Sequence, residues 1–447
     1  MTIPALFASR LGRRPLETVQ PHVLGVATLV MVLASRPLWW TAADSPRVPW
    51  FTTSWLDFDP SGWWGLGLLA LQLLSIAGFA WTGGGRITST LALAIGLIQL
   101  LPDQNRNQPW MTQFLVSCLW FVTLPRPQAL AMARLYLVAL YVHSGLSKLD
   151  VGFVREIAPN LLSVTPLGDP TIAPWWREAA AWAMPSAEAL CGLALVAGPT
   201  RRLGLIGVVL MHLTLLAILG PVGLNQSANV LIWNFALAIQ AVVLFGWVDE
   251  SGRFQTDTPS TPLAATPRAT EAEGVLAPVG RLAALVVLVA PLTERSGWWD
   301  AWPSFALYAG HTERVVVELD RQTLDDLDAC WRVGLVEPEA AEAPASPWVR
   351  FDLNAWSLAR RGAPIYPQAR SALGLAEAIL RRIHTQRHQH ARDDPNSPAS
   401  PPPLRFRVRV YGRSERGTLT HPLWFECQTF GDFPVAARRF WLNARGR

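Results

Sequence analysis

Long apolar stretches separated by short polar segments fill the first two thirds of the chain. They lie at 21–38, 62–81, 87–103, 110–124, 129–149, 180–199, 203–221, 228–247 and 276–293. Most are close to the length of about 17–25 residues that a helix needs to cross a bilayer. The pattern predicts an all-α polytopic membrane bundle of about nine transmembrane helices. Because the stretches near Pro102, Pro109 and Pro125 are short, one pair could instead form a re-entrant hairpin.

The chain divides into a bundle, a linker, a last membrane helix and a C-terminal domain. The transmembrane bundle is expected over 1–248. Residues 249–275 are rich in Thr, Pro, Ser and Glu and predict a linker. The last transmembrane helix is expected at 276–293, and residues 298–447 follow it as a small soluble α+β domain.

Three short patterns support an α+β fold for this domain. Residues 314–319 are rich in valine, and 406–411 alternate between apolar and polar residues, as strands do. Residues 373–383 have the spacing of an amphipathic helix. The His- and Pro-rich run 384–403 is predicted to be a solvated loop.

The composition fits a lipid environment. Apolar residues make up 51% of the chain and charged residues only 16%, below the roughly 25% of soluble globular proteins. The 22 tryptophans gather beside the apolar stretches, often as pairs: Trp39-Trp40, Trp63-Trp64, Trp175-Trp176 and Trp298-Trp299. Because an indole ring suits the headgroup layer, these pairs indicate where the chain enters and leaves the bilayer.

The basic residues of the short loops predict an orientation. Alternate loops contain arginines: Arg86, Arg126, Arg201 and Arg202. The intervening loops 35–61 and 150–179 hold more acids than bases. Since cytoplasmic loops carry the excess of Lys and Arg, we expect a multi-pass protein of the cell membrane with a cytoplasmic N-terminus and an extracytoplasmic C-terminal domain.

Charge and cysteine spacing argue against two other classes of protein. The net charge of +5 is spread over loops and the C-terminal domain, so no nucleic-acid partner is expected. The four cysteines form no CxxC or zinc-type spacing, so no metal site is predicted. The lipid bilayer is the expected partner.

Four ionisable side chains of the apolar stretches stand out as candidates: Arg134, Lys148, Glu188 and His212. A Lys or Arg at the centre of a span costs about 2.5–3.5 kcal/mol, so each needs a physical reason. Lys148 is the single lysine among 38 Lys and Arg residues. A position that remains lysine in so arginine-rich a chain indicates a need for a primary amine.

Each candidate also has a structural explanation. Lys148 lies near the end of its stretch, where its amine could reach the headgroups. Glu188 lies early in the next expected helix, where a carboxylate could cap the helix start. Alternatively, Glu188 could pair across helices with Lys148 or Arg134. His212 is either a hydrogen-bonded structural histidine or a proton-handling group.

Helical spacing adds neighbours to these candidates. Arg134, Tyr141 and Lys148 are each two turns apart, so they share one stripe of a helix together with Gly145. We expect this stripe to face protein.

The polar loop 102–110 is a further candidate for ligand binding. It contains Arg106 and ends at Trp110, and its amides and guanidinium could bind a ligand head group. Alternatively, these groups could satisfy a broken backbone between two helices.

The segment from Tyr141 to Asp150 contains G-L-S-K-L-D, which resembles the G-V-K-K-L-D of vitamin K-dependent gamma-carboxylase. Further similar positions are Glu188 through Gly192, Thr200-Arg201, Gly204 and His212. The chain thus resembles the HTTM superfamily, to which that enzyme's membrane domain belongs, over about 130–250. The C-terminal domain has no matching segment for a peptide substrate.

The resemblance implies a quinol-type pocket near the outer leaflet. The lysine that matches Lys148 is the base that deprotonates vitamin K hydroquinone in the carboxylase. Lys148 would then be the general base, with Glu188 and His212 as its partners, in a quinol-linked oxidoreductase or a carboxylase-like lyase. A lysine withheld from water can provide a neutral amine, which an arginine cannot.

A second resemblance leads to a different function. A glycine-x-x-lysine-leucine helix followed by a glutamate-bearing helix is also similar to the DoxX and MauE group. This resemblance implies a non-catalytic membrane redox partner or assembly factor, whose exported domain docks another protein. In the simplest alternative the bundle only anchors that domain.

Overall fold

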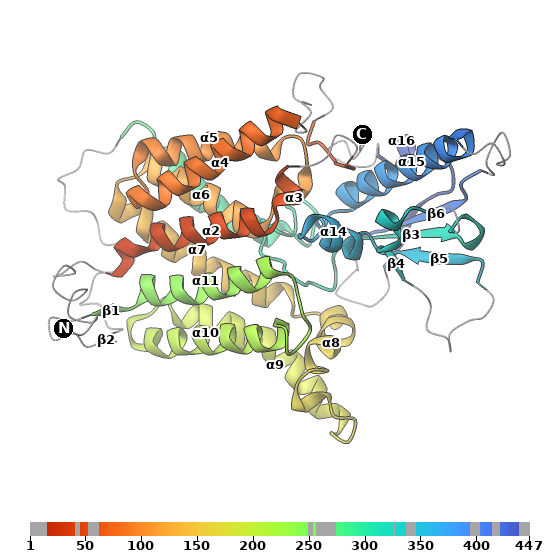
Figure 1. The fold of residues 1–447 in the computed structure, drawn as a ribbon. Helices are drawn as coiled ribbons and strands as arrows, with labels where there is room; N and C mark the ends of the chain where they lie inside the picture. Colours follow the sequence, from red (N-terminus) through yellow and green to blue (C-terminus); the bar gives the residue numbers. More distant parts are fainter. Residues whose placement is uncertain are drawn as a thin grey trace, which may run out of the picture.

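The computed structural model describes residues 16–40, 45–51, 62–248, 254–255, 274–324, 327–336, 346–393, 403–413 and 421–437. A bundle of long helices adjoins a domain in which helices pack on an antiparallel sheet (Figure 1). Most of the predicted linker 249–275 lies outside the described residues.

Each apolar stretch contains a helix. The bundle helices are α2 (Gln20–Ala34), α4 (Gly62–Thr82), α5 (Arg86–Leu100), α6 (Pro109–Thr123), α7 (Arg126–Ser147), α9 (Pro174–Ala194), α10 (Gly198–Leu219), α11 (Ala228–Phe245) and α12 (Ala277–Val289). Proline stands at the first or second position of several of them, where its missing N–H leaves no unmade hydrogen bond.

Within the described part of the chain, five helical segments are long and apolar enough to cross a membrane. They are Glu17–Ala34, Gly62–Thr82, Arg126–Ser147, Gly198–Leu219 and Ala228–Phe245. The segments Arg86–Leu100 and Ala277–Thr293 are apolar but shorter. The protein is therefore a multi-pass membrane protein, as expected, but the predicted count of nine spans is not confirmed.

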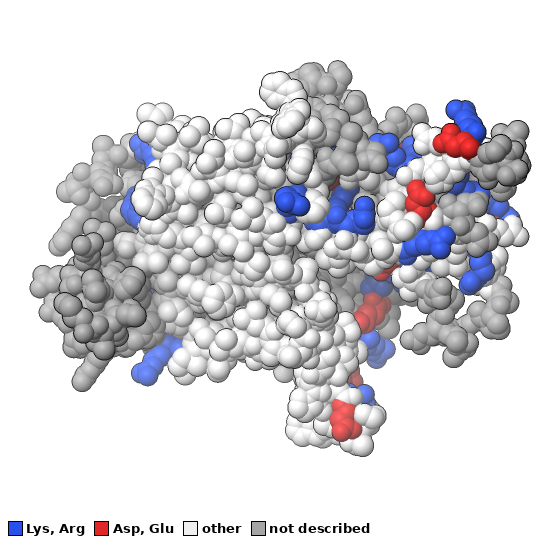
Figure 2. All heavy atoms as spheres, viewed as in Figure 1, with Lys and Arg blue, Asp and Glu red and all other residues white. Residues whose placement is uncertain are grey.

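The outer surface of the bundle is apolar. On the face shown in Figure 2, charged side chains lie near the ends of the bundle and on the C-terminal domain, and few interrupt the helices between them. Large apolar side chains such as Leu74, Leu203 and Leu210 are exposed. Because water would disfavour such a surface, the bundle is suited to lipid.

The helices pack in chain order and close into a ring. Neighbours along the chain contact each other from α2 to α11, and α11 returns to α2. The α4–α5 turn uses Gly83 and Gly84, whose φ angles of 62° and 82° disfavour other residues. Helix α12 lies against α6 and α7.

The C-terminal domain has a sheet of five strands in the order β4-β5-β3-β6-β7. These are β3 (Arg314–Asp320), β4 (Leu335–Val336), β5 (Trp348–Phe351), β6 (Phe406–Tyr411) and β7 (Leu423–Cys427), with α13 (Ala329–Arg332), α14 (Leu353–Arg361), α15 (Ala369–Asp393) and α16 (Asp432–Ala437). Val317 of β3 pairs with Phe351 and Val408, so apolar residues of three antiparallel strands share one buried face.

Both predicted strands and the predicted helix are present in this domain. The prediction of a loop over 384–403 is wrong for its first half, because α15 continues to Asp393. Packing favours the longer helix: Gln386 accepts a hydrogen bond of 2.6 Å from the Trp331 indole, and Arg387 is buried. Tertiary contacts here override the polar character of the sequence.

The domain covers one end of the bundle. The Tyr366 backbone N–H donates to Asn105 Oδ1 at 2.9 Å, and Arg361 pairs with Asp103 at 3.4 Å. Val48, from the segment after α3 (Arg36–Trp39), belongs to the core of the domain. The covered end is the one at which α7 ends, because Asp150, two residues after Lys148, lies 3.0 Å from His311 Nδ1.

Candidate functional site

Lys148 and Glu188 form an ion pair between α7 and α9. Lys148 Nζ lies 2.6 Å from Glu188 Oε2, and it also donates to Ser144 Oγ at 2.8 Å. The two side chains are 12% and 13% exposed. Lys148 therefore does not extend to the headgroups. Lys148 and Arg134 were both considered as partners of Glu188, and the structure pairs Glu188 with Lys148.

Small residues bring α7 and α9 together at this level. A Cβ on Gly145 would lie 2.6 Å from the carbonyl oxygen of Pro185, and a Cβ on Gly192 would lie 2.8 Å from the Cβ of Tyr141. Gly145 thus acts by close packing and does not line the cavity described below. Because α9 begins at Pro174 and includes Pro185, Glu188 lies in the helix interior, and the expectation that it caps a helix start is wrong.

A second polar group joins α7, α10 and α11. The Tyr141 hydroxyl lies 3.0 Å from His212 Nε2, and His212 Nδ1 lies 3.0 Å from Asn234 Oδ1. Asn234 Nδ2 donates to the Val230 carbonyl, so its Oδ1 accepts from His212 Nδ1–H. His212 Nε2 is then the acceptor of the Tyr141 hydroxyl, and the chain is satisfied with a neutral histidine.

Both polar groups line one cavity of about 750 Å³. It extends from Tyr366 in the domain to Gly207 on α10, so it enters the bundle from the covered end. Lys148, Glu188, Tyr141, His212 and Trp110 all line it. Most of the remaining walls are apolar, as in pockets that take small hydrophobic molecules.

Some polar atoms of this cavity have no hydrogen-bond partner among the described residues. They are the Trp110 indole Nε1, Ser227 Oγ and Asn229 Oδ1. Trp110 is 2% exposed and Asn229 is 3% exposed. A buried polar atom without a partner costs about 1–3 kcal/mol, so a polar group or water beside these side chains would be favoured over an apolar one.

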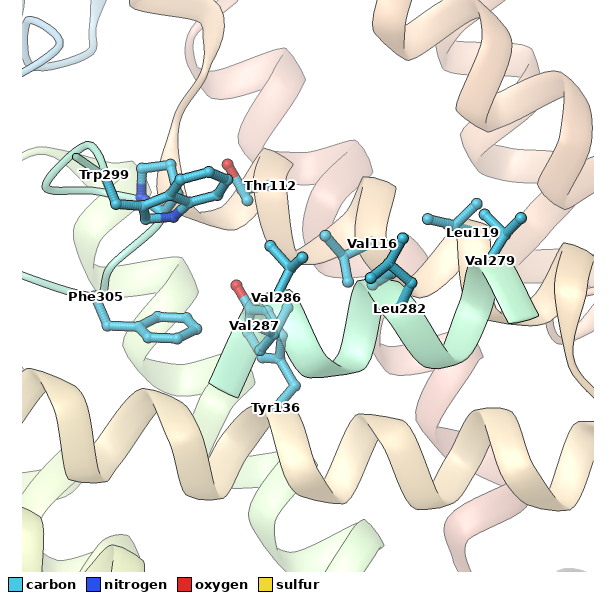
Figure 3. Close-up of a pocket in the computed structure, with 12 residues that line it drawn as sticks. Thr112, Val116, Leu119, Tyr136, Val279, Leu282, Val286, Val287, Trp299 and Phe305 are labelled. Carbon is cyan, nitrogen blue, oxygen red and sulfur yellow. The ribbon is translucent and has the colours of Figure 1, made fainter. Parts of the chain in front are cut away.

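A smaller cavity of about 300 Å³ lies between α6 and α12. Figure 3 shows its apolar walls, with Leu282 and Val286 of α12 near Val116 of α6, and Trp299 at one end. Its lining contains no ionisable group other than the Tyr136 phenol. The larger cavity is therefore the better candidate for a functional site.

Arg134 lies away from the cavity, contrary to its expected place in the site. Its Nε donates to the Leu244 carbonyl at 2.8 Å, and its guanidinium pairs with Glu17. It shares a helix with Lys148, but it lies toward the opposite end of α7. Helical spacing could not determine how far along the helix the cavity extends.

Arg106 is also absent from the cavity lining. It is fully buried, and its donors bond the carbonyl oxygens of Leu38 and Trp39 and the side chain of Gln99 at 2.7–3.0 Å. Burial lowers its pKa to about 10, which leaves it protonated at neutral pH. Arg106 thus satisfies backbone carbonyls between two helices and does not face a ligand. Trp110, at the end of the same loop, does line the cavity.

The sequence interpretation missed several residues of the site. Ser144 and Asn234 hold Lys148 and His212, and both are polar residues inside apolar stretches, which is a signal that could have identified them. The domain also contributes Tyr308, Glu313 and Tyr366 to the walls. Nothing in the local sequence indicates that these residues face the bundle.

The helices that carry this site correspond to a known family model. Residues 126–230 match the family of the methylamine utilisation protein MauE. This part of the chain is similar to MauE. The match extends from α7 into α11 and contains Tyr141, Lys148, Glu188 and His212.

The match covers about a quarter of the chain, so it describes the central helices and not the C-terminal domain. It supports the second of the two resemblances, to the DoxX and MauE group, and gives no support to the HTTM resemblance. No curated protein and no solved structure matches the chain.

Proposed function

We propose that this membrane protein binds a lipid-soluble small molecule of the quinol type in the larger cavity. The observation that carries the proposal is that Lys148–Glu188 and Tyr141–His212–Asn234, the polar groups of four helices, line one mostly apolar cavity. The apolar walls suit a ring and tail, and the polar groups suit hydroxyl or carbonyl oxygens.

In this proposal Lys148 is the general base. A proton can move along the 2.6 Å hydrogen bond from Nζ to Glu188 Oε2, which leaves a neutral amine and a protonated carboxyl. The transfer leaves no charge on either group, so the amine has a free lone pair. The amine then accepts a proton from a quinol hydroxyl. The Tyr141 oxygen, whose own proton is donated to His212 Nε2, would accept a hydrogen bond from the second quinol hydroxyl.

Ligand binding is tested by filling the cavity. Met211 of α10 lines the cavity, whereas Leu213 of the same helix is 53% exposed and does not. We expect Met211→Trp to reduce binding of a short-tailed quinone at least tenfold in equilibrium dialysis. Leu213→Trp, the matched control, should bind as the wild type does. Equal binding by both variants, or none by the wild type, would exclude the proposal.

The role of Lys148 as base is tested with Lys148→Arg, which keeps the charge. Under anaerobic conditions, a quinol bound to the wild type should show the red-shifted absorption of the quinolate anion, and this shift should be absent with Lys148→Arg. A shift of equal size in both would exclude the general base, because arginine does not deprotonate in proteins.

A non-catalytic membrane partner is the second candidate function. The observation in its favour is that Lys148 is already paired with Glu188, so the amine has a structural role without any ligand. In that case Lys148→Arg retains full function in cells, and the exported domain docks another protein.

A further inference from the structure

We infer that the larger cavity selects an amphiphile with an uncharged polar head and excludes charged lipids and fatty acids. This inference rests on the proposed function and names the chemistry of its ligand. It depends on the charges and unpartnered atoms of the cavity wall, and not on the identity of any ring system.

The charged groups of the wall already have partners. Among the described residues that line the cavity, they are Lys148, Glu188 and Glu313. Lys148 and Glu188 pair with each other at 2.6 Å. Glu313 lies 3.6 Å from Arg413 Nε, whose guanidinium also pairs with Glu294, and it accepts from the Ala369 backbone N–H at 2.8 Å. Each charged group of the wall thus has a partner, and the Lys148–Glu188 pair leaves no net charge on α7 and α9 to compensate a charged head group.

The atoms that lack partners are neutral and of both kinds. The Trp110 indole N–H is a donor, Asn229 Oδ1 is an acceptor, and the Ser227 hydroxyl is both. An uncharged head with hydroxyl or carbonyl groups offers both the donors and the acceptors that such atoms need. An anion would leave Asn229 Oδ1 unsatisfied, and a cation would leave the Trp110 N–H unsatisfied.

Desolvation gives this arrangement its selectivity. A charged head loses its hydration on entering the cavity, and a balanced ion pair returns little of that loss. A neutral hydroxyl loses much less hydration free energy and recovers it through hydrogen bonds to the cavity wall. Removal of one member of the pair should reverse the preference, because the remaining charge then needs a counter-ion.

The experiment compares photoactivatable amphiphiles that share one tail and differ in the head: an alcohol, a sulfate and a trimethylammonium. The full-length protein in neutral-lipid nanodiscs is labelled, and peptides of α9 and α10 are quantified by mass spectrometry. For the wild type we expect the alcohol to label these helices at least about tenfold more than either ion. In Glu188→Gln, labelling by the sulfate should rise about tenfold, and in Lys148→Met labelling by the trimethylammonium should rise similarly.

Glu17→Gln is the matched control. It removes a carboxylate that also pairs with a cation of α7, but this pair lies outside the cavity. It should leave the order of the three amphiphiles unchanged.

The outcomes separate the inference from the proposed function. Equal labelling of the wild type by the alcohol and the sulfate would overturn the inference and leave binding of an amphiphile intact. Glu188→Gln with no gain for the sulfate would also overturn it. An absence of labelling by every amphiphile in every variant would overturn both.

Discussion

The Lys148–Glu188 pair is the residue-scale feature on which the site depends. Its side chains are mostly withheld from water but face the cavity and not a packed core. A pair of this kind is costly to break on one side, because the remaining charge has lost both water and its partner. Replacing both members of the pair with apolar residues costs much less free energy of unfolding.

This asymmetry predicts the result of a double-mutant cycle. Lys148→Met and Glu188→Met should each lower the free energy of unfolding by about 3 kcal/mol, near the lower end for buried pairs because the cavity gives some access. The double variant should recover most of that loss. Chemical unfolding in detergent micelles measures all of these values, and additive losses would contradict the account.

The residue scale is also where the sequence was most informative. The single lysine and the glutamate forty residues later were recognised from their cost in lipid, and the structure brings them together. Arg134 was chosen by the same rule and Arg106 as part of a polar loop, but backbone carbonyls and Glu17 hold them elsewhere. The cost of burial identifies residues that need a partner, but it does not identify the partner.

At the scale of elements, the contact of α7 with α9 determines the geometry of the site. It depends on Gly145 and Gly192, where a Cβ would lie under 3.0 Å from the facing helix. Substitution at such a contact forces the two backbones apart, and the Lys148–Glu188 bond lies on the same interface.

We therefore predict that Gly145→Ala lowers the free energy of unfolding by about 1–3 kcal/mol and weakens ligand binding. Gly67→Ala in α4 is the control, because nothing lies within 4 Å of the added Cβ. The control should be neutral or slightly stabilising, since alanine favours a helix over glycine. Thermal unfolding in nanodiscs compares the two, and equal transition temperatures would contradict this role for Gly145.

Elements were predicted better than their boundaries. Apolar runs located the helices, because lipid requires each span to satisfy its own backbone. The start of α9 was missed by several residues because the apolar stretch begins only at 180, after the charged residues Arg177 and Glu178, whereas the helix begins at Pro174. The end of α15 was missed because polar residues were taken as a loop, although Gln386 and Arg387 pack on the domain.

At the scale of the whole molecule, the position of the domain over the bundle was not predictable, because it depends on contacts between distant segments. One such contact is a buried cluster around His311. Its Nδ1 lies 3.0 Å from Asp150 Oδ2 and its Nε2 lies 2.8 Å from Glu294 Oε2. Arg413 pairs with Glu294, and Arg295 lies nearby. The cluster joins the end of the bundle to the sheet.

This cluster predicts a pH-dependent attachment of the domain. Burial alone would lower the pKa of His311, but its hydrogen bonds to Asp150 and Glu294 outweigh burial and raise it above 6.5. Burial likewise opposes ionisation of Asp150 and Glu294, but His311 lowers both pKa values below 3.8 and 4.5. The stabilisation of the attached domain by this cluster is therefore complete between pH 4.5 and pH 6.5. It declines as the pH rises through the raised pKa of His311.

Hydrogen exchange at β3 and β6 measures this attachment. We expect exchange, corrected for its intrinsic pH dependence, to increase from pH 6 to pH 9 in the wild type. His311→Gln should exchange faster at pH 6 and lose most of this dependence. His390→Gln, an exposed histidine of α15, is the control and should resemble the wild type. A wild-type profile independent of pH would contradict the role of the cluster.

The whole-molecule orientation gives a further prediction. A cysteine-free chain with His390→Cys in the domain should react in intact cells with a membrane-impermeant maleimide. Arg202→Cys, at the opposite end of the bundle, should react only after lysis, because the positive-inside rule places it in the cytoplasm. The reverse pattern would place the domain in the cytoplasm.

The central claim is that a lipid-soluble ligand binds beside Lys148, between the bundle and the domain. Electron cryomicroscopy of the protein in nanodiscs made from its native lipids tests this claim most directly. The account predicts elongated density in the larger cavity, with its polar end within hydrogen-bonding distance of Lys148 Nζ or Glu188. A cavity closed by side chains, or an Nζ atom that points into open solvent or bulk lipid, would contradict it.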